Sequence, residues 1–175
     1  MTFLETKRLR LRNIDEKDVD EMFDYRNNQI CAKYQRKQEK NYEKLAEWIK
    51  SKTCDTLNVE TSALIAVALK ETDSLIGEIT VMPNEGTISF GYTFSYKVHR
   101  QGYAFEALST LIDYLHSHYP EWDYVCFTDV DNIPSKALLK KLGYTDLGYL
   151  HSKDSQIFGK WLRPDTIEEI AQAVR

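Results

Sequence analysis

The segment His99–Leu108 reads HRQGYAFEAL and places one glycine directly before a run of apolar residues at helical spacing. Gly102 has no Cβ, so backbone can approach a ligand closely there. The first N–H groups of the following helix have no partners inside it, and the helix dipole adds roughly half a positive charge at that end. These groups together favour an anion such as phosphate. The residues alone fit equally well a tight strand-to-helix turn that holds no ligand.

Two known phosphate motifs do not fit this segment. A P-loop needs a lysine and a Ser or Thr after its second glycine, and both are missing here. A dinucleotide fingerprint needs three glycines near the first strand, whereas only Gly102 is present. The glycine turn is therefore a weak signal until its surroundings are considered.

A second group of polar residues lies about thirty residues later, in the segment NIPSKALLKKLGY. Asn132 can both donate and accept hydrogen bonds through its amide. Ser135 follows three residues later, where most serines bond to the backbone in the first turn of a helix. Pro134 suits the first turn of a helix, and Gly143 suits the position just after its end.

The elements that must position these residues follow from periodicity and turn signals. Asp15 and Asn41 are expected near the starts of the first two helices. A helix is expected from Gly102 to about His118, another over residues 132–144, and a short one after Pro164. Seven strands are expected, at residues 7–14, 63–69, 75–81, 87–96, 123–130, 145–152 and 155–162. The order of elements predicts an α/β (α+β) fold with a mixed sheet, in which the strands before Gly102 and before Asn132 are parallel neighbours.

The composition narrows the class of protein. The 175 residues carry a net charge of −4 without a basic stripe, so nucleic acid is not an expected partner. There is no signal peptide and no apolar run of transmembrane length, so we expect a cytoplasmic protein without membrane association. Cys31, Cys54 and Cys126 lack the spacing of a disulfide framework or a zinc site, and no metal is expected. We expect one domain over residues 1–175.

These features resemble the GNAT superfamily of N-acetyltransferases. The acetyl-CoA motif of that family, Q/R-x-x-G-x-G/A, corresponds to residues 99–104, and its following motif corresponds to Asn132 and to Gly143-Tyr144. Residues 5–28, together with GYAFEAL, are similar to the ribosomal-protein N-terminal (RimJ/RimL-like) branch. The likeness covers nearly the whole chain.

The resemblance implies a GNAT fold, with a mostly antiparallel seven-stranded sheet that splays at its central parallel pair. It implies that backbone amides hold the CoA diphosphate and that pantetheine fills the gap as a pseudo-strand. The cofactor-binding residues it implies are Phe94, Tyr96, Arg100, Gln101, Gly102, Tyr103, Ala104, Phe105, Asn132 and Lys136.

Two departures from the family pattern bear on catalysis. Ser89 stands where an acid is frequent in the branch, and Leu139 stands where many GNAT enzymes carry a tyrosine near the CoA sulfur. RimL-like enzymes place a serine at the position of Ser135, which makes it the candidate general acid. Glu78 is the candidate base, either facing an acceptor cleft or lying on the solvent side of an alternating strand.

We therefore expect an acetyl-CoA-dependent N-acetyltransferase that acts on a primary amine, either a protein N-terminus or a small molecule, by direct transfer in a ternary complex. A monomer or a homodimer is expected. The alternative within the same fold is a catalytically weak CoA-binding module that regulates or scaffolds. A further alternative is an interaction domain whose Gly102 turn holds no ligand.

Overall fold

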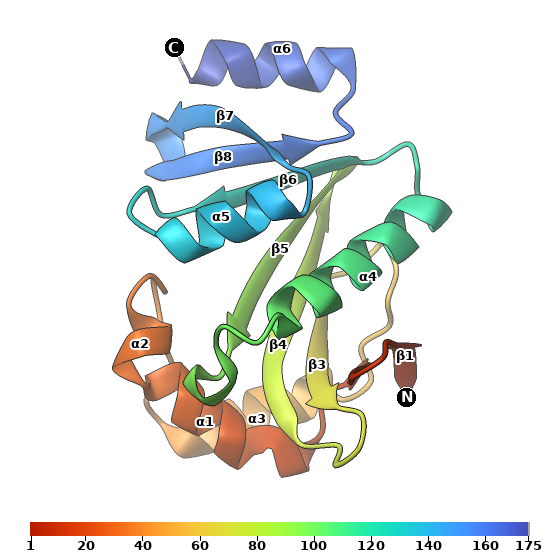
Figure 1. Ribbon diagram of the computed structural model, residues 1–175, viewed down its shortest axis with the longest axis vertical. Helices are drawn as coiled ribbons and strands as arrows, with labels where there is room; N and C mark the ends of the chain where they lie inside the picture. The colour runs from red at the N-terminus through yellow and green to blue at the C-terminus, as the bar shows by residue number, and fades with distance from the viewer. Residues whose placement is uncertain (175) are drawn as a thin grey trace.

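A computed structural model shows one sheet of eight strands in the order β1-β2-β3-β4-β5-β6-β8-β7, in which β5 and β6 are parallel and the other neighbours antiparallel (Figure 1). The structure describes residues 1–174. The strands are β1 (Thr2–Glu5), β2 (Leu9–Asn13), β3 (Ala63–Leu69), β4 (Leu75–Asn84), β5 (Thr87–Phe94), β6 (Asp123–Thr128), β7 (Thr145–Leu150) and β8 (Ser155–Lys160). The α-helices are α1 (Val19–Asn27), α2 (Gln29–Ala32), α3 (Tyr42–Lys52), α4 (Tyr103–His118), α5 (Ile133–Lys141) and α6 (Pro164–Ala173). Three short 3-10 helices are η1 (Glu16–Asp18), η2 (Tyr96–Val98) and η3 (His151–Lys153).

The predicted elements occur in the expected order, but the structure adds one strand and one short helix, α2, that were not expected. The extra strand is β1, an edge strand that pairs only with β2 and alternates weakly between exposed and half-buried residues. Its pattern is too weak to indicate a strand without its neighbour. Asn41 caps α3 by accepting the N–H of Lys44, and Gly143 has φ +91° directly after α5, both as expected.

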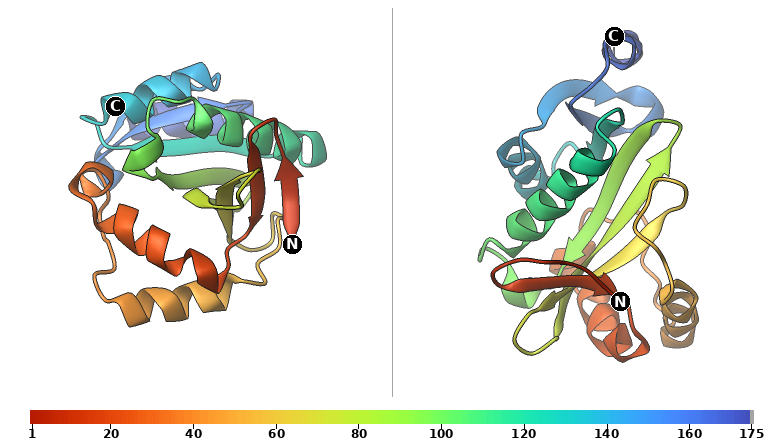
Figure 2. Two further views of the ribbon diagram at one scale, coloured as in Figure 1. Left: turned by 60° about the horizontal axis from the view of Figure 1, so that its bottom comes forward. Right: turned by 90° about the vertical axis from the view of Figure 1, so that its right-hand side faces the viewer.

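Helices cover both faces of the sheet (Figure 2). Strand β3 is covered by helices on both faces of the sheet. Ile65 and Val67 belong to the core under α4, whereas Leu64 and Ala66 belong to the core under α1 and α3. Its continuous apolar sequence follows from this two-sided burial. Helix α6 covers a smaller cluster on β6, β7 and β8. Within residues 1–174, no helix is long and apolar enough to span a bilayer.

The parallel strands β5 and β6 pair over two residue pairs only, Thr87 with Asp123 and Ile88 with Tyr124. Beyond this point β5 continues along β4, and β6 continues along β8 (Figure 1). Each strand therefore keeps one hydrogen-bonded neighbour while the two separate from each other. The predicted splay is confirmed, and it leaves one edge of each strand without a strand partner.

Asp123 anchors the point at which the two strands still meet. Its side chain is fully buried and accepts hydrogen bonds from the Arg163 backbone N–H at 2.6 Å, from Arg163 Nη2 at 2.9 Å and from the Thr166 hydroxyl. Its own N–H donates to Gly86 O at 2.8 Å. Burial alone would raise the pKa of Asp123, but the bonds from Arg163 and Thr166 lower it below its usual value. The first residue of β6 is thus tied both to the turn before β5 and to the start of α6.

We expect Asp123→Asn to lower the free energy of unfolding at neutral pH by about 1–3 kcal/mol, because a charged acceptor of several hydrogen bonds is lost. The pKa of Asp123 is lowered on folding, so its contribution is present above about pH 4, the value of an unperturbed Asp, and is lost as the pH falls. Urea unfolding at pH 7 and at about pH 3 should show the difference from wild type shrinking in acid. The exposed Asp113→Asn is the control, and equal stability of Asp123→Asn and wild type at pH 7 would contradict the assignment.

Candidate active site

The turn before α4 has the geometry that the glycine predicted. Gly102 is the residue before the helix and has φ +80°, in the left-handed region that favours glycine. Arg100 also has a positive φ, +62°. The first backbone bond of the helix runs from Glu106 N to Gly102 O, at 3.1 Å. The N–H groups of residues 103–105 therefore precede the helical hydrogen-bond ladder and are available to an anion.

Glu106 ties this turn to the connection between β1 and β2. Its Oε1 accepts from Thr6 Oγ1 at 2.6 Å and from Arg8 N at 3.0 Å, and its Oε2 accepts from Arg8 Nε at 2.6 Å. Burial alone would raise the pKa of Glu106, but these bonds lower it. Glu106 therefore has a structural role in the first turn of α4.

Arg8 was not identified from the sequence, yet it lies directly against the turn. Its Nη1 donates to Gln101 O at 3.0 Å, and its guanidinium lies 4.2 Å from the centre of the Tyr103 ring. Its Nη2 would be 3.5 Å from a Cβ added at Gly102. The fold therefore places a second arginine, besides Arg100, beside the free amides. Arg8 and Glu106 are 98 residues apart, so no local pattern could have paired them.

A cavity of about 330 Å³ opens where β5 and β6 separate. Its walls come from the middle of both strands, the start of α5, the segment after α2 and the turn between β7 and β8. The lining residues are Tyr34, Gln35, Arg36, Phe90, Gly91, Tyr92, Cys126, Phe127, Thr128, Asp129, Asn132, Ser135, Leu139, Lys153 and Ser155. Two residues predicted from the sequence, Asn132 and Ser135, are thus brought together in one cavity.

Ser135 and Tyr92 form a hydroxyl pair in this cavity, with 2.8 Å between the two oxygens. The N–H of Ser135 donates to Asn132 Oδ1 at 3.2 Å, so Asn132 caps α5 with its oxygen and keeps its amide NH₂ for other partners. Burial raises the pKa of Tyr92 above its usual value, although the bond with Ser135 opposes this. The phenol therefore stays protonated at neutral pH and can donate to Ser135. The sequence contained Tyr92 in the strand but gave no sign of its partner.

The alternation of backbone hydrogen bonds along β5 decides which N–H and C=O groups face the space between β5 and β6. Ser95 N donates to Ile76 O at 2.8 Å, so the residues at odd positions of β5 bond to β4. The N–H and C=O groups of Tyr92 and Phe94 consequently point toward β6. The Phe94 carbonyl already accepts from His99 Nε2 at 2.8 Å, which leaves its N–H for a ligand.

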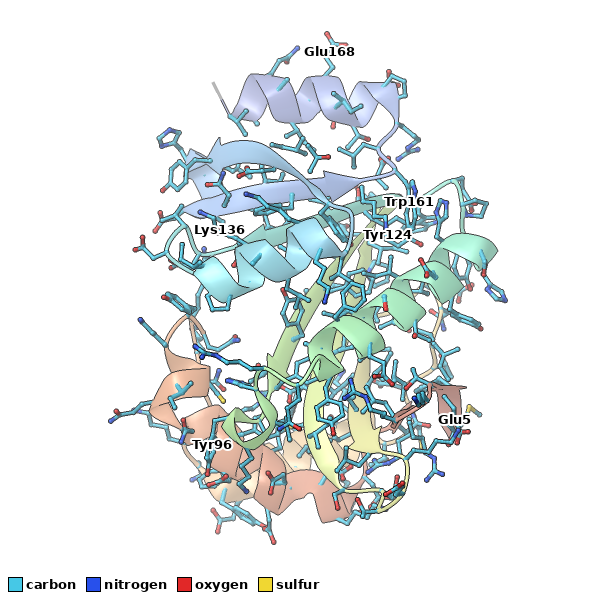
Figure 3. All side chains as sticks on the ribbon, viewed as in Figure 1. Glu5, Tyr96, Tyr124, Lys136, Trp161 and Glu168 are labelled. Atoms are coloured by element: carbon cyan, nitrogen blue, oxygen red, sulfur yellow. The ribbon has the colours of Figure 1, made fainter. Side chains whose placement is uncertain are left out.

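Tyr96 and Lys136, two of the residues expected to bind the cofactor, are labelled in Figure 3. Tyr96 is in η2, beyond the end of β5, and its hydroxyl donates to Asp24 on α1 at 3.0 Å. Lys136 is on α5, and its Nζ donates to Val130 O at 3.0 Å. Both side chains thus bond to other parts of the protein, Tyr96 to α1 and Lys136 to the loop before α5.

Glu78 occupies neither of the positions expected for it. Its side chain is only 2% exposed and lies on the sheet face under α1, where it accepts from the Tyr25 hydroxyl and from Arg26 Nε at 2.8 Å. Burial raises the pKa of Glu78 well above its usual value, with an opposing effect of the Thr93 hydroxyl, and burial lowers the pKa of Arg26 to about 10. Glu78 is also absent from the residues that line the cavity. A β-strand alternation cannot distinguish a solvent face from a face covered by a helix, which explains the difference.

Cys126 lies at the inner wall of the cavity but belongs to the core. It is 2% exposed, and burial raises the pKa of its thiol to about 11. The thiolate required of a nucleophile is therefore disfavoured at neutral pH. Cys126 is therefore a small core side chain.

Comparison with known proteins agrees with this geometry. Residues 8–145 match the family described as acetyltransferase (GNAT) domain. An uncharacterized N-acetyltransferase of Bacillus subtilis, YnaD, is 27% identical over 82% of this chain and 83% of its own length.

Solved structures share the fold. A GNAT-family acetyltransferase from Bacillus anthracis superposes with a TM-score of 0.77 at 19% identity, over 90% of this chain and 95% of the other. The ribosomal-protein α-N-acetyltransferase RimL in complex with coenzyme A gives a TM-score of 0.73 at 14% identity, over 91% and 97% of the two chains. The family match, the splayed sheet and the glycine turn at α4 lead to one conclusion: the chain belongs to the GNAT family of acetyltransferases, enzymes whose acetyl donor is acetyl-CoA.

Proposed function

We propose that this protein transfers the acetyl group of acetyl-CoA to a primary amine as a RimJ/RimL-like N-acetyltransferase. The observation that carries the proposal is the cavity at the separation of β5 and β6, with the Tyr92–Ser135 pair inside it. The free edge of β5 leads from this cavity to the turn at Gly102, so one extended ligand can occupy both places. The whole reaction is assigned to a single domain.

We assign the binding of acetyl-CoA mainly to backbone and side-chain amides that the structure leaves available. The amides of residues 101–105 hold the diphosphate, with Arg100 and Arg8 supplying positive charge beside it. The N–H of Phe94 and the amide NH₂ of Asn132 hold the pantetheine arm, and Tyr96 and Lys136 contribute at its edges. When bound, acetyl-CoA supplies a thioester with a reactive carbonyl and a thiolate leaving group.

The reaction needs two proton transfers: the amine must lose a proton, and the departing sulfur gains one. A free α-amine has a pKa near 8, so about a tenth of it is neutral at pH 7, and holding it in place supplies much of the rate. A strand N–H in the gap stabilises the negative charge that develops on the carbonyl oxygen. Ser135 donates its proton to the departing sulfur as the C–S bond breaks, while Tyr92 donates a hydrogen bond to Ser135 and orients it. The proton that the amine nitrogen loses on forming the amide bond returns to Ser135, directly or through solvent.

Direct transfer between the two bound substrates follows from the state of the remaining groups. Cys126 is a poor nucleophile because of its raised pKa, which argues against an acetylated enzyme. We now assign Glu78 to the packing of α1 on the sheet rather than to proton removal, because its carboxylate is bonded to Tyr25 and Arg26.

A catalytically weak CoA-binding module is the second candidate, favoured by Leu139, which is 1% exposed where many family members carry a tyrosine. Measuring CoA release with a panel of peptides and amines separates the two. Tight binding of acetyl-CoA without turnover on any amine would support the module.

Gly102→Asn tests the diphosphate site without breaking the turn. Asparagine tolerates the left-handed conformation, so we expect a free energy of unfolding within about 1 kcal/mol of wild type. The added side chain crowds the free amides, so affinity for acetyl-CoA should fall about tenfold or more, a loss of roughly 1.4 kcal/mol. Calorimetric titration measures it, and Gly143→Asn, at a similar φ after α5, is the matched control. Undiminished affinity in Gly102→Asn would remove the diphosphate from this turn.

Ser135→Ala tests the general acid. We expect kcat to fall about 10- to 100-fold with little change in the affinity for acetyl-CoA, because only the proton donor is lost. Tyr92→Phe should give a smaller decrease, since Ser135 keeps its own proton. Steady-state kinetics and binding titrations provide both values. Wild-type kcat in Ser135→Ala would exclude this serine from the chemistry.

A further inference from the structure

The charged side chains at one side of the cavity point to the class of amine that enters it. This side is formed by the segment Tyr34–Arg36, which follows α2, and by Lys153 and Ser155 at the turn between β7 and β8. None of these residues is among the catalytic or cofactor-binding residues expected from the sequence. A role for them in binding the acceptor rests on the proposed function.

The segment is fixed in place by side-chain hydrogen bonds to three different elements. These bonds run from Tyr34 Oη to Asp131 O at 2.9 Å, from Gln35 Nε2 to Thr93 Oγ1 at 3.3 Å, and from Arg36 Nη2 to Ser155 Oγ at 3.0 Å. A guanidinium held in this way loses little conformational freedom when it binds a ligand. Arg36 is therefore preorganised at the cavity.

Arg36 and Lys153 carry positive charge without an anionic partner. Neither forms an ion pair within 4.0 Å in the described part of the chain. Lys153 Nζ instead lies 5.0 Å from the centre of the Phe127 ring, on the cavity wall. Of the seven arginines in residues 1–174, five are in ion pairs, which leaves Arg36 here and Arg100 at the turn before α4.

One carboxylate lines the same cavity. Asp129 accepts the N–H of Asp131 through Oδ1 at 2.9 Å, and it forms no ion pair among residues 1–174. A cavity with two cations and one carboxylate matches a ligand that carries both signs of charge. Asp129 suits an ammonium group, whereas the guanidinium of Arg36 suits the planar or tetrahedral oxygens of a carboxylate or phosphate.

We propose that the acceptor is a small primary amine that carries a carboxylate or phosphate group on the same molecule, with the anionic group bound by Arg36 and Lys153. The volume of about 330 Å³ must also admit the acetylated end of the donor, which favours a small acceptor. Polyamines and aminoglycosides, which carry several positive charges, are repelled by the two cations.

The test uses acceptors that differ in the anionic group alone. Wild-type protein is assayed for CoA release with glycine against glycinamide, with phosphoethanolamine against ethanolamine, and with spermidine. The two pairs distinguish a carboxylate from a phosphate. We expect kcat/KM to be about tenfold or more higher for the anionic member of at least one pair, because charged hydrogen bonds to Arg36 are lost in the neutral member. The amide has the less basic amine of its pair, so amine reactivity alone would give the opposite order.

Arg36→Gln and Lys153→Gln should remove most of that preference by raising KM for the anionic acceptor. Arg36→Lys should restore part of it, which separates charge from folding. Lys37→Gln, at an exposed neighbouring lysine outside the cavity, is the matched control and should keep the preference. Affinity for acetyl-CoA, measured by titration, should be unchanged in all four variants.

The outcomes separate this inference from the function on which it rests. Equal kcat/KM within both pairs, a preference for spermidine, or a preference that survives Arg36→Gln would overturn the anionic acceptor and leave acetyl transfer intact. Transfer to peptide N-termini alone would overturn the small acceptor. Acetyl-CoA binding without transfer to any of these amines or peptides would overturn the proposed function, and the acceptor class with it.

Discussion

The separation of β5 from β6 after two residue pairs is the constraint on which the rest of the structure depends. A free strand edge costs unsatisfied backbone groups unless another partner takes them, so such an edge inside a sheet needs a ligand or water. The tie at Asp123 holds the strands together at one end, and the ladders with β4 and β8 keep each strand straight beyond it. The gap is therefore built into the sheet and does not require a movement to open.

The second requirement is that the turn at Gly102 keeps its place at the end of the gap. Helix α4 is packed on the sheet through its apolar side, but its first turn is fixed by polar contacts of Glu106 with Thr6 and Arg8. These contacts make the edge hairpin of β1 and β2 part of the donor site. Thr6 and Arg8, in the connection between β1 and β2, thus hold the first turn of α4 in place.

The sequence predicted the features that depend on neighbouring residues, such as the ends of helices. Gly102, Asn132 and Gly143 mark helix boundaries through local backbone rules, and the structure confirms those boundaries. It did not predict pairs formed across the fold, such as Tyr92 with Ser135, because each partner is an ordinary residue in its own element. Glu78 was misplaced for the same reason: only the packing of α1 decides that this strand face is closed.

The charges divide the proposed reaction between the turn before α4 and the cavity between β5 and β6. At the α4 end, Arg8 and Arg100 lie beside unpaired amides and suit a strongly anionic group. In the cavity, Arg36 and Lys153 are lining residues together with Asp129, which suits a molecule with both charges. The hydroxyls of Tyr92 and Ser135 are uncharged at neutral pH, and they remain so once the proton that Ser135 gives to the sulfur is replaced by the proton that the amine loses. This arrangement supports catalysis by position and hydrogen bonding, and the neutral fraction of the acceptor amine is the form that reacts.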